Sequence, residues 1–185
     1  ESVNFADYDW DGDGMVEQAY VVYAGKGEAN GGAASTIWPH EWELYSSDYG
    51  KYLKLDGVNI NVYACGCELG YTGAIDGIGT MCHEFSHCMG LPDMYDTSGG
   101  SGYGMFNWSI MDYGSYNEDG FVPAGYTSYE KMYCGWLQPE EITADTTISA
   151  LRPLSEGGGA YIIYNDGNRN EYFLLENRQL TGWDA

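Results

Sequence analysis

The chain has 185 residues, enough for a domain with a hydrophobic core, and its 44% hydrophobic content excludes a disordered chain. Lys and Arg number 7 against 28 Asp and Glu, so the net charge of −21 excludes nucleic acid and anionic lipid as partners and favours divalent cations. No apolar run reaches the roughly 18 residues of a membrane span, so we expect no membrane insertion. The oligomeric state stays open.

The chain begins with Glu and carries no signal peptide, so we expect a trimmed chain whose N-terminal part is missing. The lack of a signal peptide therefore does not argue against secretion. The cysteine count is odd and no Cys-x-x-Cys pair occurs, which argues against a zinc ribbon. Buried free thiols and a disulfide from Cys65 or Cys67 to Cys82 or Cys88 both remain open; Cys134 is the fifth cysteine.

The first predicted element is an acidic loop, DWDGDGMVE, at residues 9–17. It follows the first part of a calcium-binding loop, with carboxylates at positions 1, 3 and 5, glycine at 6 and a backbone carbonyl at 7. Position 12 is Tyr20 instead of Glu, so this is not a complete helix–loop–helix hand, and Glu17 or Asp7 is left to fill the shell. Four aspartates within seven residues repel one another unless a cation lies among them. The predicted structural calcium ligands are Asp9, Asp11, Asp13, Met15 and Glu17; the alternative is a solvated acidic turn.

Two strands and an aromatic segment follow in chain order. EQAYVVYAG (17–25) and NINVYACGC (59–67) predict strands, because both are rich in β-branched residues or tyrosine. IWPHEWEL (37–44), which lies between them, is predicted to be packed. It contains His40, which we interpret as a packed or hydrogen-bonded histidine.

The segment AIDGIGTMCHEFSHCMG (74–90) predicts a helix. Asp76 is the expected N-cap, and Gly90 is expected to end the helix in the left-handed conformation. Apolar side chains at 81, 85 and 89 recur on one face, and His83 and His87 share another face, roughly opposite. We therefore expect a core helix that is buried on both sides.

The remainder of the chain changes in character near residue 138. Residues 98–120 are turn-rich, and residues 127–137 predict a short helix capped by Thr127 or Ser128 and ended by Gly135. Beyond Pro139, residues 146–154 predict a strand, and residues 159–179 predict a hairpin around DGNR. The predicted domains are a catalytic region at 1–137 and a truncated β-hairpin extension at 138–185.

The strongest chemical signal is the pattern H-E-x-x-H formed by His83, Glu84 and His87. On a helix, positions i and i+4 lie one turn apart, so both imidazoles can bind one zinc ion. Glu84 lies beside them and can act as general base toward a water that the metal activates. The alternative is a pair of hydrogen-bonded core histidines, which would leave the downstream residues without a role.

Those downstream residues predict the third ligand. Gly90 lets the chain leave the helix in a conformation closed to residues with a Cβ, and the turn brings Asp93 under the metal. Glu130, on the later predicted helix, is the rival, although it gives Gly90 and Asp93 no role. Asp96 is a weaker candidate, which could instead lie next to Asp93 and orient it without binding the metal itself.

At this point the chain resembles a known family. HEFSHCMGLPDMYD (83–96) is similar to the zinc signature of the metzincin clan and, more closely, to that of the immune-inhibitor-A-like secreted metallopeptidases. SIMDYG (109–114) resembles the methionine turn of metzincins. The stretches STIWPHEW and EYFLLENRQLTGWD also look like parts of this family, and the resemblance runs from DYDWDGDG to the end of the chain.

The resemblance implies further roles. Met111 would form a hydrophobic floor beneath the metal, and Tyr113 would stabilise the oxyanion of the tetrahedral intermediate. The alternatives are an ordinary core methionine and a packed tyrosine. The resemblance also implies activation by removal of a pro-segment. Cys88, beside His87, departs from the family pattern, and burial is its default interpretation.

Taken together, the sequence predicts an α+β, zincin-like catalytic domain with a twisted mixed sheet over an active-site helix. The predicted function is a secreted zinc endopeptidase that hydrolyses proteins or peptides. Two other classes stay open: an inactive zinc-binding module that holds peptides, and a calcium-dependent structural or adhesion domain. Substrate specificity cannot be inferred, because the cleft is formed by residues that are distant in sequence.

Overall fold

The computed structural model describes residues 3–184, and the chain folds into two compact units. Unit 1 comprises Glu1–Gly90 and Asp119–Phe121, and unit 2 comprises Leu91–Glu118 and Val122–Ala185. Helices and small mixed sheets alternate along the chain, which confirms an α+β composition. Among the described residues, no helix is long and apolar enough to cross a membrane.

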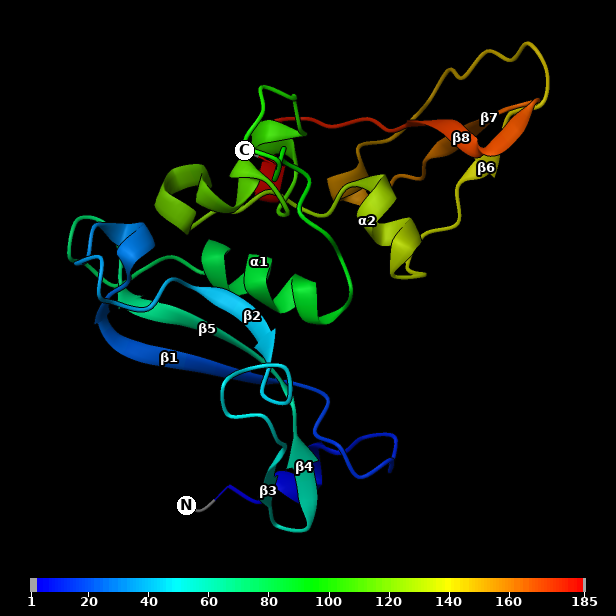
Figure 1. Cartoon of the computed structure of the whole chain (residues 1–185). Helices are drawn as coiled ribbons and strands as arrows, with labels where there is room; N and C mark the ends of the chain where they lie inside the picture. Colours follow the sequence, from blue (N-terminus) through cyan, green and yellow to red (C-terminus); the bar gives the residue numbers. More distant parts are fainter. Residues whose placement is uncertain (1–2, 185) are drawn as a thin grey trace. The chain divides into compact units, whose positions relative to one another are not determined.

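The main sheet of unit 1 has three strands in the order β1–β5–β2 (Figure 1). β1 (Ala19–Lys26) pairs in parallel with β5 (Val62–Leu69), and β2 (His40–Glu43) pairs antiparallel with the other edge of β5. The centre of β5 is buried because its residues 64–67 are small. A Cβ at Gly66 would lie 2.3 Å from the Tyr20 hydroxyl of β1, so a larger residue there would have to displace the end of that side chain. The two predicted strands are thus confirmed.

The helix α1 (Gly79–Cys88) packs on this sheet against β5 and β2 (Figure 1). The helix was predicted, but two of its details were wrong. Ile78 precedes it without a side-chain cap, because Asp76 is turned to the sheet and accepts hydrogen bonds from Asn30 Nδ2 at 3.1 Å and the Cys67 thiol at 3.8 Å. The helix is also not buried on both sides, since the side chains at 81 and 85 are 39% and 41% exposed.

The start of α1 is fixed by backbone packing instead of a cap. Gly77 lies against the backbone at Gly120, where a Cβ would come within 2.2 Å of the Gly120 carbonyl carbon. This close approach explains why Asp119–Phe121 belongs to unit 1, although it comes thirty residues after the helix ends. Any side chain at position 77 would force this crossing apart.

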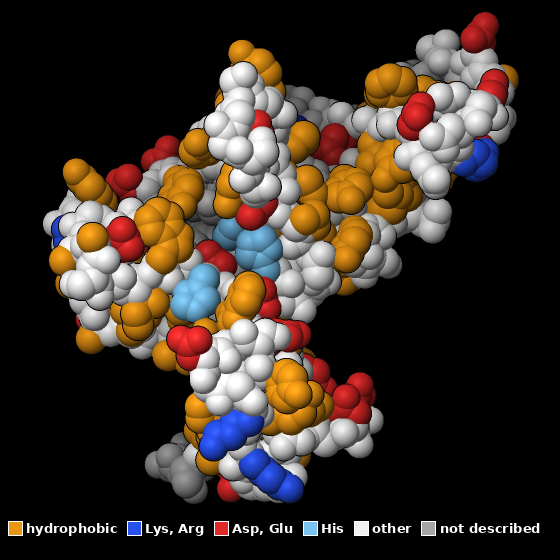
Figure 2. Space-filling view, in the orientation of Figure 1, with side chains coloured by type: hydrophobic (Ala, Val, Ile, Leu, Met, Phe, Trp, Pro, Cys, Tyr) orange, Lys and Arg blue, Asp and Glu red, His pale blue; other side chains and the backbone are white. Residues whose placement is uncertain are grey.

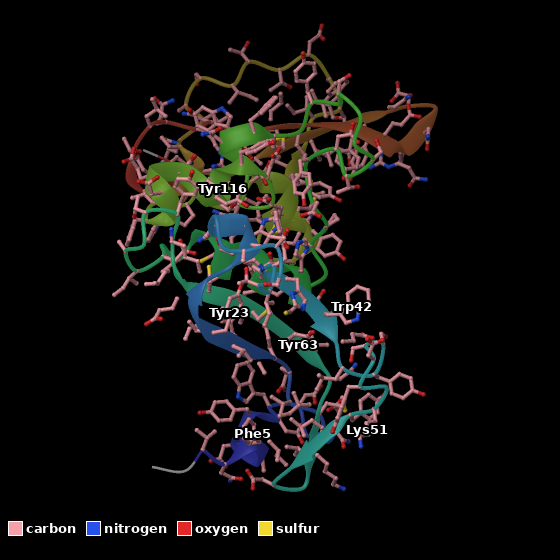
Figure 3. All side chains as sticks on the ribbon, turned by 60° about the vertical axis from the view of Figure 1, so that its left-hand side comes forward. Phe5, Tyr23, Trp42, Lys51, Tyr63 and Tyr116 are labelled. Carbon is pink, nitrogen blue, oxygen red and sulfur yellow. The ribbon has the colours of Figure 1, made fainter. Side chains whose placement is uncertain are left out.

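A small second sheet supports the acidic loop. β3 (Leu53–Leu55) and β4 (Val58–Ile60) form a hairpin whose turn residues Asp56 and Gly57 both have positive φ, as a two-residue turn requires. Val16, at the end of the acidic loop, is buried against β4, and Phe5 of the short helix η1 (Phe5–Tyr8) packs on the same cluster (Figure 3). The loop is therefore anchored to a core.

The aromatic segment around β2 differs from its prediction. Trp38 and Trp42 are 57% and 50% exposed, whereas Pro39 is buried and Leu44 packs on the core cluster around Val16, so the segment is packed only in part. β2 is an edge strand, and Trp42 projects from it (Figure 3) with half of its surface exposed. Between β1 and β2 the chain forms only the short helix η2 (Glu28–Asn30).

Unit 2 begins with irregular chain and short 3-10 helices, η3 (Phe106–Trp108) and η4 (Tyr113–Gly120). The predicted helix follows as α2 (Ser128–Tyr133), and its N-terminus carries a capping box between Thr127 and Glu130. Gly135 has φ 73° and ends the helix as expected.

The second sheet lies in unit 2 and has the order β6–β7–β8, formed by β6 (Glu140–Glu141), β7 (Tyr161–Asn165) and β8 (Asn168–Leu175). The predicted hairpin is confirmed as β7–β8. The strand predicted at 146–154 was wrong, because β6 and β8 occupy both edges of β7. That segment instead leads into η5 (Leu154–Glu156), at the N-cap Pro153.

The end of the chain is bound to α2 by a buried arginine. Arg178 donates hydrogen bonds to Glu176 at 2.7 Å, to Asp184 of η6 (Gly182–Asp184) at 2.5 Å and to the Gly125 carbonyl at 2.8 Å. Glu176 in turn accepts from the backbone N–H of Ser128. Residues beyond 138 thus support the helix before them. The division at 137/138 stays a prediction, and the compact units divide at other positions.

We predict that Arg178→Met lowers the free energy of unfolding by about 3–5 kcal/mol, because it leaves the buried carboxylate of Asp184 and the half-buried carboxylate of Glu176 without their cation. Arg169→Met is the matched control, since Arg169 pairs with Glu141 on the surface and its loss should change stability far less. Urea denaturation measured by tryptophan fluorescence would compare the two. Equal losses of stability in both variants would contradict the assigned role of Arg178.

Candidate metal centre

The helix α1 brings together His83, Glu84 and His87, and their ligand atoms lie within 4.8 Å of one another. The two Nε2 atoms are 3.2 Å apart, and the rings meet edge to face with centroids 4.8 Å apart. Two nitrogens that each bind zinc at 2.0–2.1 Å with tetrahedral angles would be about 3.3–3.4 Å apart. The pair therefore fits a zinc ion, and Figure 2 shows that histidine side chains reach the surface.

Local contacts hold this turn of the helix. The Ser86 hydroxyl donates to the Cys82 carbonyl at 2.6 Å, and Gln18 Nε2 donates to the Phe85 carbonyl at 3.3 Å. Gly90 has φ 87° and donates its N–H to the His87 carbonyl at 2.8 Å. The predicted left-handed exit at Gly90 is confirmed, and the chain leaves the helix directly after the second histidine.

Glu84 is buried, and the sheet beneath it contributes a tyrosine. Burial raises the pKa of Tyr20, and the negative charge of Glu84 raises it further, so this hydroxyl remains protonated at neutral pH. Tyr20 therefore faces the general-base candidate as a neutral phenol. No pattern in the sequence indicates this neighbour, because Tyr20 lies more than sixty residues away on β1.

The edge strand β2 contributes a second unforeseen neighbour. Burial raises the pKa of Glu41, and the nearby His87 and His40 oppose that rise, which places the Glu41 carboxylate within the electrostatic reach of His87. His40 has partners at both nitrogens, with Nδ1 2.7 Å from the Trp38 carbonyl and Nε2 3.0 Å from the hydroxyl of Tyr63 (Figure 3). These contacts support the interpretation of His40 as a hydrogen-bonded structural residue.

All five cysteines are free thiols, so the free-thiol alternative holds over a disulfide. Burial raises the pKa of Cys88 to about 11, and the charges of Glu41 and Glu84 contribute to the rise. The thiol lies 3.7 Å from the Glu84 carbonyl oxygen, to which it donates. At neutral pH Cys88 is thus a neutral thiol within the helix, whereas metals bind the thiolate.

The predicted residues Asp93, Met111 and Tyr113 belong to unit 2. Met111 is fully buried, and its carbonyl accepts a hydrogen bond of 2.8 Å from the N–H of Met94, the residue after Asp93. The methionine turn and the Asp93 segment are therefore bound to each other. Tyr113 is 57% exposed and stacks on Phe106 with ring centroids 6.4 Å apart.

The rival ligand Glu130 is fully buried and both of its carboxylate oxygens are engaged. Oε1 accepts from the Ser109 hydroxyl and Oε2 from the N–H of Thr127, each at 2.5 Å. A carboxylate that caps its own helix and holds a neighbouring loop would lose both contacts on turning to a metal. This setting favours Asp93 over Glu130.

The acidic loop forms a second group of ligand atoms, in which Asp9, Asp11 and Glu17 lie within 4.8 Å of one another. Asp13 is not part of this group, and its Oδ1 accepts from the N–H of Met15 at 2.8 Å. Glu17 Oε1 accepts from the N–H of Trp10 at 2.6 Å, while Oε2 is buried and has no hydrogen-bond partner among the described residues.

Backbone hydrogen bonds shape this loop and attach it to β4. Asp9 accepts from the N–H groups of Gly12 and Gly14, both of which have positive φ. Gly14 and Val16 exchange hydrogen bonds with the backbone of Asn59. Gly12 and Gly14 therefore let the loop turn tightly around the Asp9 carboxylate, in a backbone conformation that residues with a Cβ rarely adopt.

Comparison with known proteins now identifies the family. Residues 4–138 match the model of a family described as "Immune inhibitor A peptidase M6, catalytic domain". The chain belongs to this family. The match includes the histidine pair on α1, the segment 109–114 and α2, so the resemblance to the immune-inhibitor-A family is confirmed.

Two relatives give the match its context. The pre-pro-metalloprotease PrtV of Vibrio cholerae serotype O1 is 30% identical over 175 positions, covering 77% of this chain and 18% of the relative. Immune inhibitor A of Bacillus thuringiensis subsp. alesti is 29% identical over 132 positions, covering 65% of this chain and 19% of the relative. The chain therefore spans less than a fifth of the length of either relative. Membership of a metallopeptidase family implies a metal, typically zinc.

Proposed function

We propose that this chain carries the catalytic centre of a secreted zinc-dependent endopeptidase. The observation that carries the proposal is the pair of imidazole nitrogens 3.2 Å apart on one turn of α1, with the Glu84 carboxylate beside them. Nitrogen donors at this separation suit zinc, and an adjacent buried carboxylate suits a general base. Family membership supports the same chemistry.

The proposed zinc ligands are His83, His87 and Asp93. The spacing through Gly90 supports Asp93, and the engagement of both Glu130 oxygens in unit 2 argues against the rival. Met111 is proposed as the floor of the site, in keeping with its complete burial. Three protein ligands leave a position open for water or substrate, as catalytic zinc sites require.

Zinc, when bound, supplies a Lewis acid that polarises the peptide carbonyl and acidifies the attacking water. Glu84 accepts a proton from that water at its carboxylate and then delivers it to the nitrogen of the leaving amine. Burial of Glu84 excludes bulk solvent from this transfer. Tyr113 donates its hydroxyl to the developing oxyanion; its exposed side chain is accessible to a substrate.

The proposed substrates are proteins or peptides, and the proposed location is outside the cell. The relatives are named a pre-pro-metalloprotease and an immune inhibitor, and the first name describes a precursor with segments to be removed. A net charge of −21 disfavours nucleic acid as a partner.

A structural calcium ion is proposed in the acidic loop. The supporting observation is Glu17 Oε2, a buried carboxylate oxygen without a hydrogen-bond partner among the described residues, which lies in a group with Asp9 and Asp11. Hard oxygen donors of this kind suit calcium, and the Asp13 carboxylate and the Met15 carbonyl are the further proposed ligands. The ion would strengthen the attachment of the loop to β4.

We predict that Glu84→Gln lowers kcat for casein or peptide cleavage by about 10²–10⁴-fold, because the amide cannot accept the proton of the attacking water. Zinc content should stay at the wild-type level, since the histidines are retained. Glu28→Gln, the same change at an exposed position of η2, should leave kcat unchanged. Wild-type activity in Glu84→Gln would exclude this mechanism, and zinc binding without chelator-sensitive cleavage in the wild type would favour a peptide-binding module.

We predict that Asp93→Ala weakens zinc binding by at least about 100-fold, because the site loses one of three protein ligands. Asp96→Ala is the matched control, since the Asp96 carboxylate is held by Ser98 and Gly102 in an exposed loop. Competition with a zinc-binding dye gives both dissociation constants. If Asp96→Ala were the more damaging change, the assignment of Asp93 would be wrong.

We predict that calcium raises the melting temperature of the wild type and that Glu17→Gln removes most of this shift, because one ligand charge is lost. Asp48→Asn, the same change of charge on an exposed residue outside the loop, should keep the shift. Scanning calorimetry with calcium and with a calcium chelator measures both. A shift that is the same in the wild type and in Glu17→Gln would place calcium elsewhere.

A further inference from the structure

A chain of buried hydrogen bonds in unit 2 connects α2 to the residue after Asp93. Its members are Glu130 on α2, Ser109 and Met111 in the methionine turn, and Met94. The first three are fully buried. These contacts join three segments that are separated by fifteen or more residues along the sequence.

The links form an unbroken path. Glu130 Oε1 accepts the Ser109 hydroxyl at 2.5 Å, and the Ser109 oxygen accepts the N–H of Met111 at 3.0 Å. The carbonyl of Met111 then accepts the N–H of Met94 at 2.8 Å. Each link uses a donor and an acceptor that are shielded from water, so a broken link leaves a buried polar group unsatisfied.

The carboxylate of Glu130 has two separate functions in this arrangement. Oε2 accepts the N–H of Thr127, and the Thr127 hydroxyl accepts the N–H of Glu130, which together close the capping box of α2. Oε1 is then directed away from the cap, toward Ser109. A capping box needs only one of the two oxygens, so the second oxygen is available to position the methionine turn.

We propose that Glu130 is a positioning residue for the metal site, acting through Ser109 and Met111 on the backbone that carries Asp93. This inference rests on the proposed function, because it assumes that Asp93 binds zinc. The charged acceptor makes the Ser109 hydrogen bond stronger than one to a neutral group. It fixes the Ser109 oxygen where it receives the Met111 N–H, and the turn is held against Met94.

The arrangement also accounts for a carboxylate in a completely buried position. Burying a carboxylate is costly unless its oxygens are hydrogen-bonded. Helix capping alone would be satisfied by an exposed Glu or Gln at this position of α2. The turn contact explains why both oxygens are enclosed and why Ser109 and Thr127 are buried around them.

The test compares the stability and the zinc affinity of two variants of the full chain, Ser109→Ala and Thr127→Ala. Ser109→Ala removes the link to the methionine turn, and Thr127→Ala removes the cap hydroxyl but leaves the Glu130–Ser109 contact in place. Both variants should lower the melting temperature. Only Ser109→Ala should weaken zinc binding, by about 10–100-fold, which is the usual effect of losing a group that orients a ligand. Competition with a zinc-binding dye, at a temperature where both variants are folded, measures the two affinities.

Cobalt substitution supplies an independent readout. The visible absorption of bound Co²⁺ reports coordination geometry, so Ser109→Ala should change the spectrum while Thr127→Ala should retain that of the wild type. Glu130→Gln is the conservative variant, because its amide oxygen can serve one of the two partners of the carboxylate. Its zinc affinity should lie between those of the wild type and Ser109→Ala, and circular dichroism would confirm that it is folded.

The outcomes separate this inference from the function on which it rests. If Ser109→Ala and Thr127→Ala bind zinc equally well, or lose affinity only in proportion to their loss of stability, Glu130 has a structural role only and the inference fails. If Asp93→Ala binds zinc as tightly as the wild type, the proposed ligand set fails first. If Asp93→Ala weakens zinc binding and Ser109→Ala does not, the inference about Glu130 fails while the proposed ligand set stands.

Discussion

The geometry of the site depends on one constraint, which is that two imidazole nitrogens must lie close together on one turn of α1. At 3.2 Å the two Nε2 atoms either share one proton as a hydrogen bond between the rings or, when both are unprotonated, bind one cation. The helix must therefore be stiff at this turn, end directly after it, and rest on a sheet. Gly90, the packing of Gly77 on Gly120, and the small residues at the centre of β5 meet these three requirements.

Buried and half-buried carboxylates organise the rest of the molecule, and each of them is held by a polar or charged partner. Glu130 is held by a hydroxyl and an amide, Glu176 and Asp184 by the guanidinium of Arg178, and Glu84 lies beside imidazoles and the neutral phenol of Tyr20. Burial without such partners would favour the protonated form. The chain contains 28 Asp and Glu residues. These few acids differ from the others because they are enclosed and have specific partners.

The same contacts connect the two ends of unit 2. Arg178 and Glu176, which lie beyond the matched family region, hold the first residues of α2, and α2 in turn holds the methionine turn through Glu130. The segment that follows β8 therefore contributes to the framework of the proposed site, although its residues carry no chemistry of their own. In unit 1, the acidic loop is attached to β4 by backbone hydrogen bonds.

The features that can be predicted from the sequence are those set by short intervals along the chain. The H-E-x-x-H spacing, the left-handed Gly90, the capping box at Thr127 and the β7–β8 hairpin are set by intervals of two to four residues, which a helix turn or a strand turn converts directly into geometry. The partners that come from distant segments are evident only in the folded chain. Asp76 turned to Asn30 instead of capping α1, Tyr20 and Glu41 approached the histidine helix, and Glu130 engaged Ser109, because burial and sheet order fix such pairings and no interval along the chain encodes them.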